Sequence, residues 1–117
     1  MKRGHRLLFL PLLLLLLSCC DHKPERHRPP ELIEESKMVE MLTDQLLIEA
    51  VIFEMPVDSN KQVFTRQYYA GWFKKYNVTQ KQFEESLDYY FNDDKDVERI
   101  MTQVQKNLVQ KKSSLKQ

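Results

Sequence analysis

Apolar residues recur at intervals of three or four along most of the chain beyond residue 30, which is the spacing of amphipathic helices. The first predicted helix begins near Pro30 and Glu31, where proline suits the opening turn, and ends at about Met55, before Pro56. At about 100° per residue, one broad face of this helix collects apolar side chains. They are Met38, Met41, Leu42, Leu46, Ile48, Ile52 and Phe53. This face is expected to contact the core.

A second helix is predicted over about residues 60–76, where Phe64, Tyr68 and Trp72 recur every four residues. The last predicted helix follows a break at residues 92–94, which also cap it. Its apolar face comprises Val97, Ile100, Met101, Val104 and Leu108. From Lys111 the sequence is expected to fray, so residues 111–117 are assigned to a tail.

The third predicted helix has the clearest start in the chain. Thr79 is the expected N-cap and Gln82 its partner in a capping box, while Val78 and Phe83 stand where a hydrophobic staple needs them. Its apolar face comprises Phe83, Leu87, Tyr90 and Phe91. The second and third helices form a predicted hairpin around residues 74–79.

No stretch alternates apolar and polar residues over strand length. The predicted fold class is therefore all-α, a small bundle of about four helices. The helical domain is expected to occupy residues 31–110.

The N-terminus begins with basic residues and continues in an unbroken apolar run, Leu7–Leu17. The run is shorter than the about 20 residues that span a bilayer in a helix, and its pattern is typical of a secretory signal. The stretch Leu16-Leu17-Ser18-Cys19 resembles the bacterial lipobox. Residues 1–18 are therefore interpreted as a cleaved lipoprotein signal peptide; the alternative is an ordinary signal peptide with two incidental cysteines.

In the lipoprotein interpretation, the sulfur of Cys19 takes a diacylglycerol and its new amino group takes a further acyl chain such as palmitate. Two or more acyl chains anchor a protein stably to a membrane. Residues 19–30 hold three prolines and many charges, and are expected to be a flexible tether. Asp21 does not directly follow Cys19, so the inner-membrane retention signal of some bacteria is absent. The outer membrane is the first choice of location and the inner membrane the second, with the domain facing the periplasm or the cell surface.

Removal of residues 1–18 leaves 15 Lys and Arg against 17 Asp and Glu, a net charge of −2. This balance gives no reason to expect nucleic-acid binding. From Ile33 onward there is neither His nor Cys, which excludes zinc sites built on them, Ser-His triads and Cys-His nucleophiles from that region. We expect no enzyme activity, no metal and no cofactor beyond the lipid on Cys19.

Charge is segregated along the chain. Residues 31–58 hold eight acids and one base, whereas residues 95–116 hold six bases and two acids. The first and last helices are expected to lie near one another and to offset each other's charge. The alternative is attraction of the basic end to anionic lipid headgroups.

Glu49 lies at the centre of the first helix's apolar stripe, with Asp44 at the edge of the stripe. Because burying an unpartnered carboxylate is costly, Glu49 is expected either to meet a partner inside the fold or to face a groove. All aromatic residues except Phe9 lie between Phe53 and Phe91. They either fill the core or line a binding groove. The candidate partner- or ligand-binding residues are Asp44, Glu49, Tyr68, Tyr69, Trp72 and Tyr90.

The order of these elements resembles the small envelope lipoproteins of domain-of-unknown-function family 4296. The resemblance rests on the lipobox, on residues 37–50 and on residues 68–104. The matching positions are Met38, Leu42, Asp44, Leu47, Glu49 and Ala50 in the first helix, and Phe83, Ser86, Tyr89 and Tyr90 in the third. It implies an envelope lipoprotein of double-membraned bacteria and no particular activity. The second half of the chain also resembles the helical N-terminal regions of periplasmic peptidyl-prolyl isomerase chaperones, in the corner at residues 76–79 and in the spacing of its helices.

Two hypotheses of different classes follow. The first is a lipid-anchored interaction module that holds an envelope protein, or a client during envelope assembly, at the aromatic-rich second and third helices. The second is a carrier of a small apolar ligand, with Glu49 and tyrosines lining its pocket. A deep enclosed apolar cavity with Glu49 at its wall favours the carrier, and a shallow open groove favours the module. A filled core with neither feature leaves only the anchor.

Overall fold

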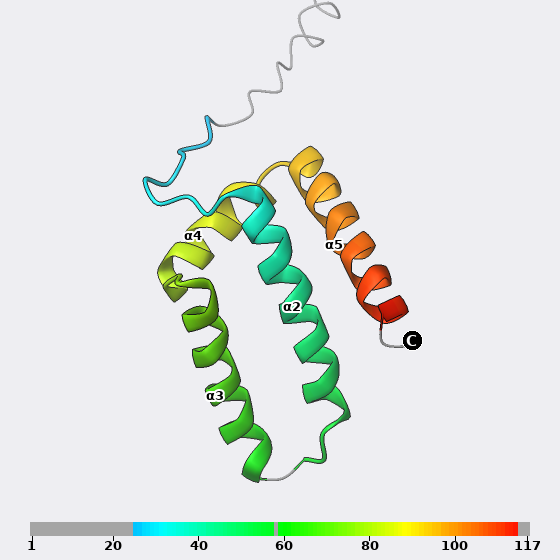
Figure 1. Ribbon diagram of the computed structural model, residues 1–117. Coiled ribbons are helices and arrows are strands. Elements are labelled where there is room, and N and C mark those ends of the chain that lie inside the picture. The colour runs from blue at the N-terminus through cyan, green and yellow to red at the C-terminus, as the bar shows by residue number, and fades with distance from the viewer. Residues whose placement is uncertain (1–24, 58, 115–117) are drawn as a thin grey trace, which may run out of the picture.

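The computed structural model describes residues 25–57 and 59–114, so Cys19 and the predicted signal peptide lie outside the described residues. The described part contains four helices: α2 (Glu35–Glu54), α3 (Ser59–Tyr76), α4 (Gln80–Phe91) and α5 (Asp94–Ser114) (Figure 1). No strand occurs within these residues. The predicted all-α class and the small four-helix bundle are confirmed.

Helix α2 lies at the centre of the bundle, between α3 and α5 (Figure 1). Helix α3 runs antiparallel to α2, whereas α5 runs in the same direction as α2. The short helix α4 lies near the N-terminal end of α2 and packs against α5. The α2–α3 hairpin therefore has a free end, away from α4.

The corner between α3 and α4 folds as its sequence predicts. Asn77 adopts a positive φ of 50°, a left-handed conformation that asparagine tolerates better than most residues. The Gln82 backbone N–H donates to Thr79 Oγ1 (3.1 Å), and the Gln82 side chain accepts from the Thr79 N–H (2.9 Å). Val78 and Phe83 are both buried. The predicted capping box is confirmed, and it fixes where α4 begins.

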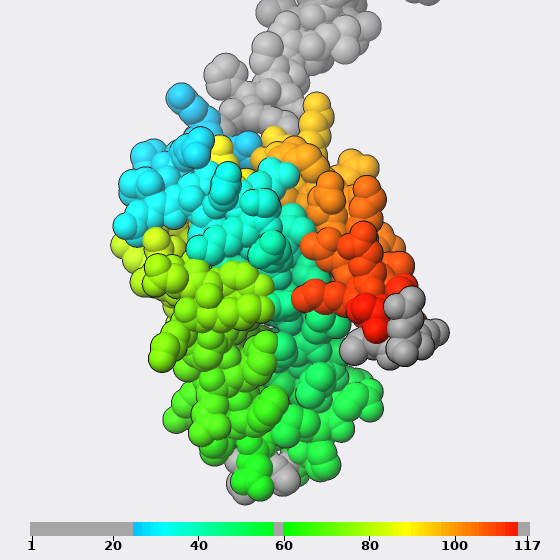
Figure 2. All heavy atoms as spheres, in the orientation of Figure 1, coloured from blue at the N-terminus to red at the C-terminus, as the bar shows by residue number. Residues whose placement is uncertain are grey.

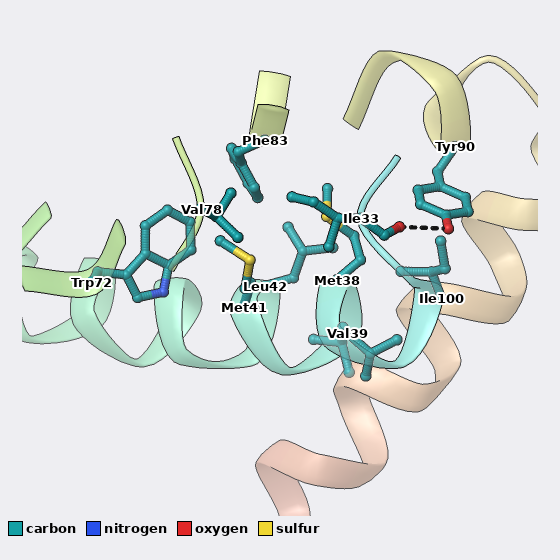
Figure 3. Close-up of a cluster of buried hydrophobic side chains, with 11 residues drawn as sticks. Ile33, Met38, Val39, Met41, Leu42, Trp72, Val78, Phe83, Tyr90 and Ile100 are labelled. Carbon is teal, nitrogen blue, oxygen red and sulfur yellow. Dashed lines mark hydrogen bonds between the residues drawn. The ribbon is translucent and has the colours of Figure 1, made fainter. Parts of the chain in front are cut away.

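A single apolar core joins the four helices and the segment before α2 (Figure 3). Its buried members are Ile33, Met38, Val39, Met41, Leu42, Trp72, Val78, Phe83, Tyr90, Ile100 and Val104. Met38, Met41 and Ile100 are fully buried. The core thus lies along the N-terminal half of α2, where α3, α4 and α5 all contribute.

The predicted start of the first helix near Pro30 and Glu31 is wrong, because α2 begins at Glu35. The reason is a pair of contacts with α4. The N–H of Ile33 donates to Ser86 Oγ (2.9 Å), and the Tyr90 hydroxyl donates to the Ile33 carbonyl (2.8 Å; Figure 3). Side chains of α4 thus satisfy both backbone groups of Ile33, and the segment before Glu35 stays non-helical.

Part of the predicted tether also packs on the domain. The Arg26 guanidinium donates to the Tyr89 carbonyl and to the Asp96 carboxylate, and it lies 4.6 Å from the centre of the Tyr89 ring. The predicted tether extends to Pro30, but these contacts attach residue 26 to α4 and α5. This part of the predicted tether is therefore bound to the domain. Residues 19–24 of the predicted tether lie outside the described residues.

Candidate functional site

Asp44 connects three helices through its carboxylate. The Lys75 ammonium (2.5 Å) and the Tyr76 hydroxyl (2.7 Å), both from α3, donate to Oδ2. The Lys111 ammonium of α5 donates to Oδ1 (2.6 Å). The prediction that the chain frays from Lys111 is wrong for residues 111–114. Helix α5 continues to Ser114, and Lys111 is bonded to α2.

The Asp44 carboxylate is buried yet fully partnered. Burial alone would raise its pKa, but the hydrogen bonds from Lys111, Lys75 and Tyr76 outweigh this effect and lower the pKa to about 2. Burial and the bond to Asp44 raise the pKa of Tyr76 to about 12. Asp44 therefore stays ionised at neutral pH as a structural tie, and it is too weak a base to take a proton there.

Glu49 meets a partner from α3. The Tyr69 hydroxyl donates to Glu49 Oε1, and burial together with this bond raises the pKa of Tyr69. Glu49 itself is exposed. Of the two alternatives for Glu49, the partner within the fold is the one observed, but the pair lies at the surface rather than at the wall of an enclosed cavity.

The remaining predicted site residues are divided between two places. Trp72 is only 3% exposed and packs edge-on against Tyr69 (5.9 Å between ring centres) and Phe83 (5.0 Å). Tyr68, half-buried, contacts Tyr69 (6.2 Å). Tyr90 lies at the other end of the core from Trp72 (Figure 3). Trp72 and Tyr90 are thus core residues, and the six candidates do not form one site.

Six exposed large apolar residues lie in the half of the α2–α3 hairpin that is away from α4, and we call them together the hairpin patch. They are Leu46, Val51, Phe53, Val57, Val63 and Phe64. Phe53 is 82% exposed and Val57 96%. Figure 2 shows this end of the α2–α3 pair extending beyond the end of α5. Large exposed apolar surfaces of this kind are typical of binding sites.

The helical period does not predict this surface, because it assigns Leu46 and Phe53 to the core-facing stripe. The missed signal is the local composition of residues 46–53, where every residue except Glu49 is apolar. A helix that is apolar all round is usually buried on all sides. Here α3 covers one side of α2 and leaves the other open.

The described residues limit the other kinds of site. No group of three His, Cys, Asp or Glu side chains among residues 25–57 and 59–114 is arranged to hold a metal ion. Within the same residues, no helix combines the length and apolar character needed to cross a membrane.

The family model described as "Domain of unknown function (DUF4296)" matches residues 29–114. Because the match covers most of the chain, the protein belongs to this family. No curated protein and no solved structure matches the chain significantly.

Proposed function

We propose that the protein is a lipid-anchored helical module of the bacterial cell envelope that binds a partner protein and catalyses no reaction. The exposed hairpin patch carries this proposal. Two of its members, Phe53 and Val57, are the most exposed of the large apolar residues of the described chain. Within the part of the chain that the structure describes, these two side chains stay exposed, whereas the core residues of α4 and α5 are buried.

The position of the patch agrees with an N-terminal anchor. The chain enters the domain beside α4 and α5, where Arg26 is bonded, and the hairpin patch lies at the opposite end of α2 (Figure 1). A lipid on Cys19 would therefore hold the α4 end nearest the membrane. The patch would then point away from the lipid surface, where a partner can reach it.

The carrier hypothesis receives less support. Glu49 is exposed and bonded to Tyr69, and Trp72 is enclosed among other aromatic rings. The hollow beside Asp44, about 360 Å³, opens to solvent and is lined by charged and polar residues such as Glu40, Gln110 and Lys111. An apolar ligand is poorly matched to such a lining.

Two experiments test the two parts of the proposal. Metabolic labelling with a clickable fatty acid should tag the native protein and fail on Cys19→Ala; equal labelling of both contradicts the anchor. A photo-crosslinking amino acid at position 53 in living cells should trap one reproducible envelope protein. The same probe at position 109, on α5, should not trap it. Identical products at both positions, or none at position 53, contradict the interaction.

A further inference from the structure

One row of α2 residues follows the spacing of a coiled-coil seam. Steps of four and three residues connect Val39, Thr43, Leu46, Ala50 and Phe53 of α2. Side chains with this spacing lie along one side of a helix and pack against a neighbouring helix. The row, which we call the α2 seam, is longer than the helix that covers it.

Helix α5 covers only the first part of the α2 seam. Val39 is 7% exposed and Thr43 is 1% exposed. Both residues line hollows that they share with Asn107 of α5. The bond between Lys111 and Asp44 marks how far α5 extends along α2, since α5 ends one turn later at Ser114.

Beyond that point the α2 seam is open. Leu46 is 42% exposed, Ala50 is exposed and Phe53 is 82% exposed. By its spacing, this open part continues the row that begins with Val39 and Thr43, and Figure 1 shows α2 extending beyond the end of α5. A helix placed there would extend the α2–α5 packing rather than create a new kind of contact.

Charge indicates which kind of helix fits. Along the covered part, bases of α5 pair with acids of α2: Arg99 lies 2.6 Å from Glu35, and Lys111 lies 2.6 Å from Asp44. The open part is flanked by acids again, Glu49 and Glu54. A second copy of α2 would bring further acids to this surface, which like-charge repulsion disfavours.

We propose that the open part of the α2 seam binds an amphipathic helix of a partner protein whose apolar stripe is flanked by Lys or Arg. This inference rests on the proposed interaction function and names the chemistry of the partner. The apolar stripe would cover Leu46, Ala50 and Phe53, and the basic residues would face Glu49 and Glu54. Helix-in-groove recognition of this type is common among peptide-binding proteins.

Two fluorescent heptad peptides of equal length test the proposal. Both carry Leu at positions a and d; one has Lys and the other Glu at positions e and g. Titration with the full chain in a zwitterionic detergent, followed by fluorescence anisotropy, should give at least about tenfold tighter binding of the Lys peptide. Equal affinities, or tighter binding of the Glu peptide, overturn the proposal.

Variants locate the binding surface. The double variant Leu46→Ser, Phe53→Ser should weaken binding of the Lys peptide at least about tenfold. Val109→Ser, at an exposed valine on α5, should leave binding unchanged. Both variants replace exposed residues, and circular dichroism checks that they remain helical. Binding that survives the double variant overturns the assignment of the surface.

Analytical ultracentrifugation tests whether a second copy of the chain, and not a partner protein, occupies the α2 seam. A dimer that dissociates on Phe53→Ser would assign the α2 seam to self-association and overturn the proposal. If neither peptide binds while crosslinking at position 53 still traps an envelope protein, the basic-helix inference fails and the proposed function stands. If the crosslink is absent as well, both fail.

Discussion

The Lys111 ammonium lies 2.6 Å from Asp44, so the end of α5 is bonded to the middle of α2. The same carboxylate accepts hydrogen bonds from Lys75 and Tyr76 of α3. Three helices therefore depend on one buried charge. This arrangement also confirms the expectation that the acidic first helix and the basic last helix lie together and offset each other's charge.

Replacement of Asp44 by Ala should lower the free energy of unfolding by about 2 kcal/mol, because several charge-assisted hydrogen bonds are lost. Lys111→Met should cost about 1 kcal/mol or less, since its ammonium is half exposed. Urea denaturation followed by circular dichroism measures both. Lys106→Met, at an exposed position of α5, is the control and should have almost no effect. Equal stability of the Asp44→Ala and Lys106→Met variants would refute the structural role of Asp44.

Stability should decline in acid because of Asp44. Its pKa is lowered from 3.8 to about 2 in the folded state, so its contribution is present above about pH 4 and is lost as the pH falls towards 2. Arg99 lowers the pKa of Glu35 and Arg26 lowers that of Asp96, which act in the same direction. The Asp44 contribution amounts to about 2 kcal/mol.

Urea denaturation at a series of pH values between about 5 and 2 measures this effect. The Asp44→Asn variant should begin less stable and lose less stability across the same range, because its amide does not titrate. Parallel pH profiles for the native chain and the variant would show that Asp44 is not the source.

Tyr90→Phe should destabilise the domain by about 1 kcal/mol, because the Ile33 carbonyl loses its hydrogen bond. Tyr89→Phe is a matched control on the neighbouring position: it keeps the ring that Arg26 contacts. Thermal unfolding of both variants measures the difference. A shift in melting temperature that is equal for the two would contradict the role of the Tyr90 hydroxyl.

Trp72 should tolerate Phe much better than Ala. The indole N–H is buried and has no hydrogen-bond partner among the described residues, so Phe removes an unsatisfied donor while it keeps an aromatic ring in the core. Trp72→Ala leaves a cavity and should cost about 3 kcal/mol or more. Urea denaturation followed by circular dichroism compares them. Equal losses for Ala and Phe would mean that the site is not tightly packed.

Local features of the fold are predictable from sequence. The α4 start depends on Thr79, Gln82, Val78 and Phe83, which are neighbours in the chain, and every one of them behaves as expected. Features that depend on distant contacts are not predictable in this way. The start of α2 is set by Ser86 and Tyr90, which are more than 50 positions away.

The candidate site residues show the same difference between local features and those that depend on distant contacts. The helical period places Asp44 at the edge of the apolar stripe, but it does not reveal the partners Lys75 and Lys111, which come from two other helices. The period also assigns Leu46 and Phe53 to the core, because it reports which side of a helix is apolar and not what lies against that side. Their exposure follows from the position at which α5 ends, which only the assembled bundle reveals.

The contacts that attach the N-terminal segment to α4 and α5 have a mechanical consequence. A pulling force on residue 25 would reach Arg26 first, and would be resisted by Asp96 and Tyr89. The next point of resistance is Ile33, held by Ser86 and Tyr90. Tension along the chain is thus transmitted to α4 and α5 before it reaches the first turn of α2.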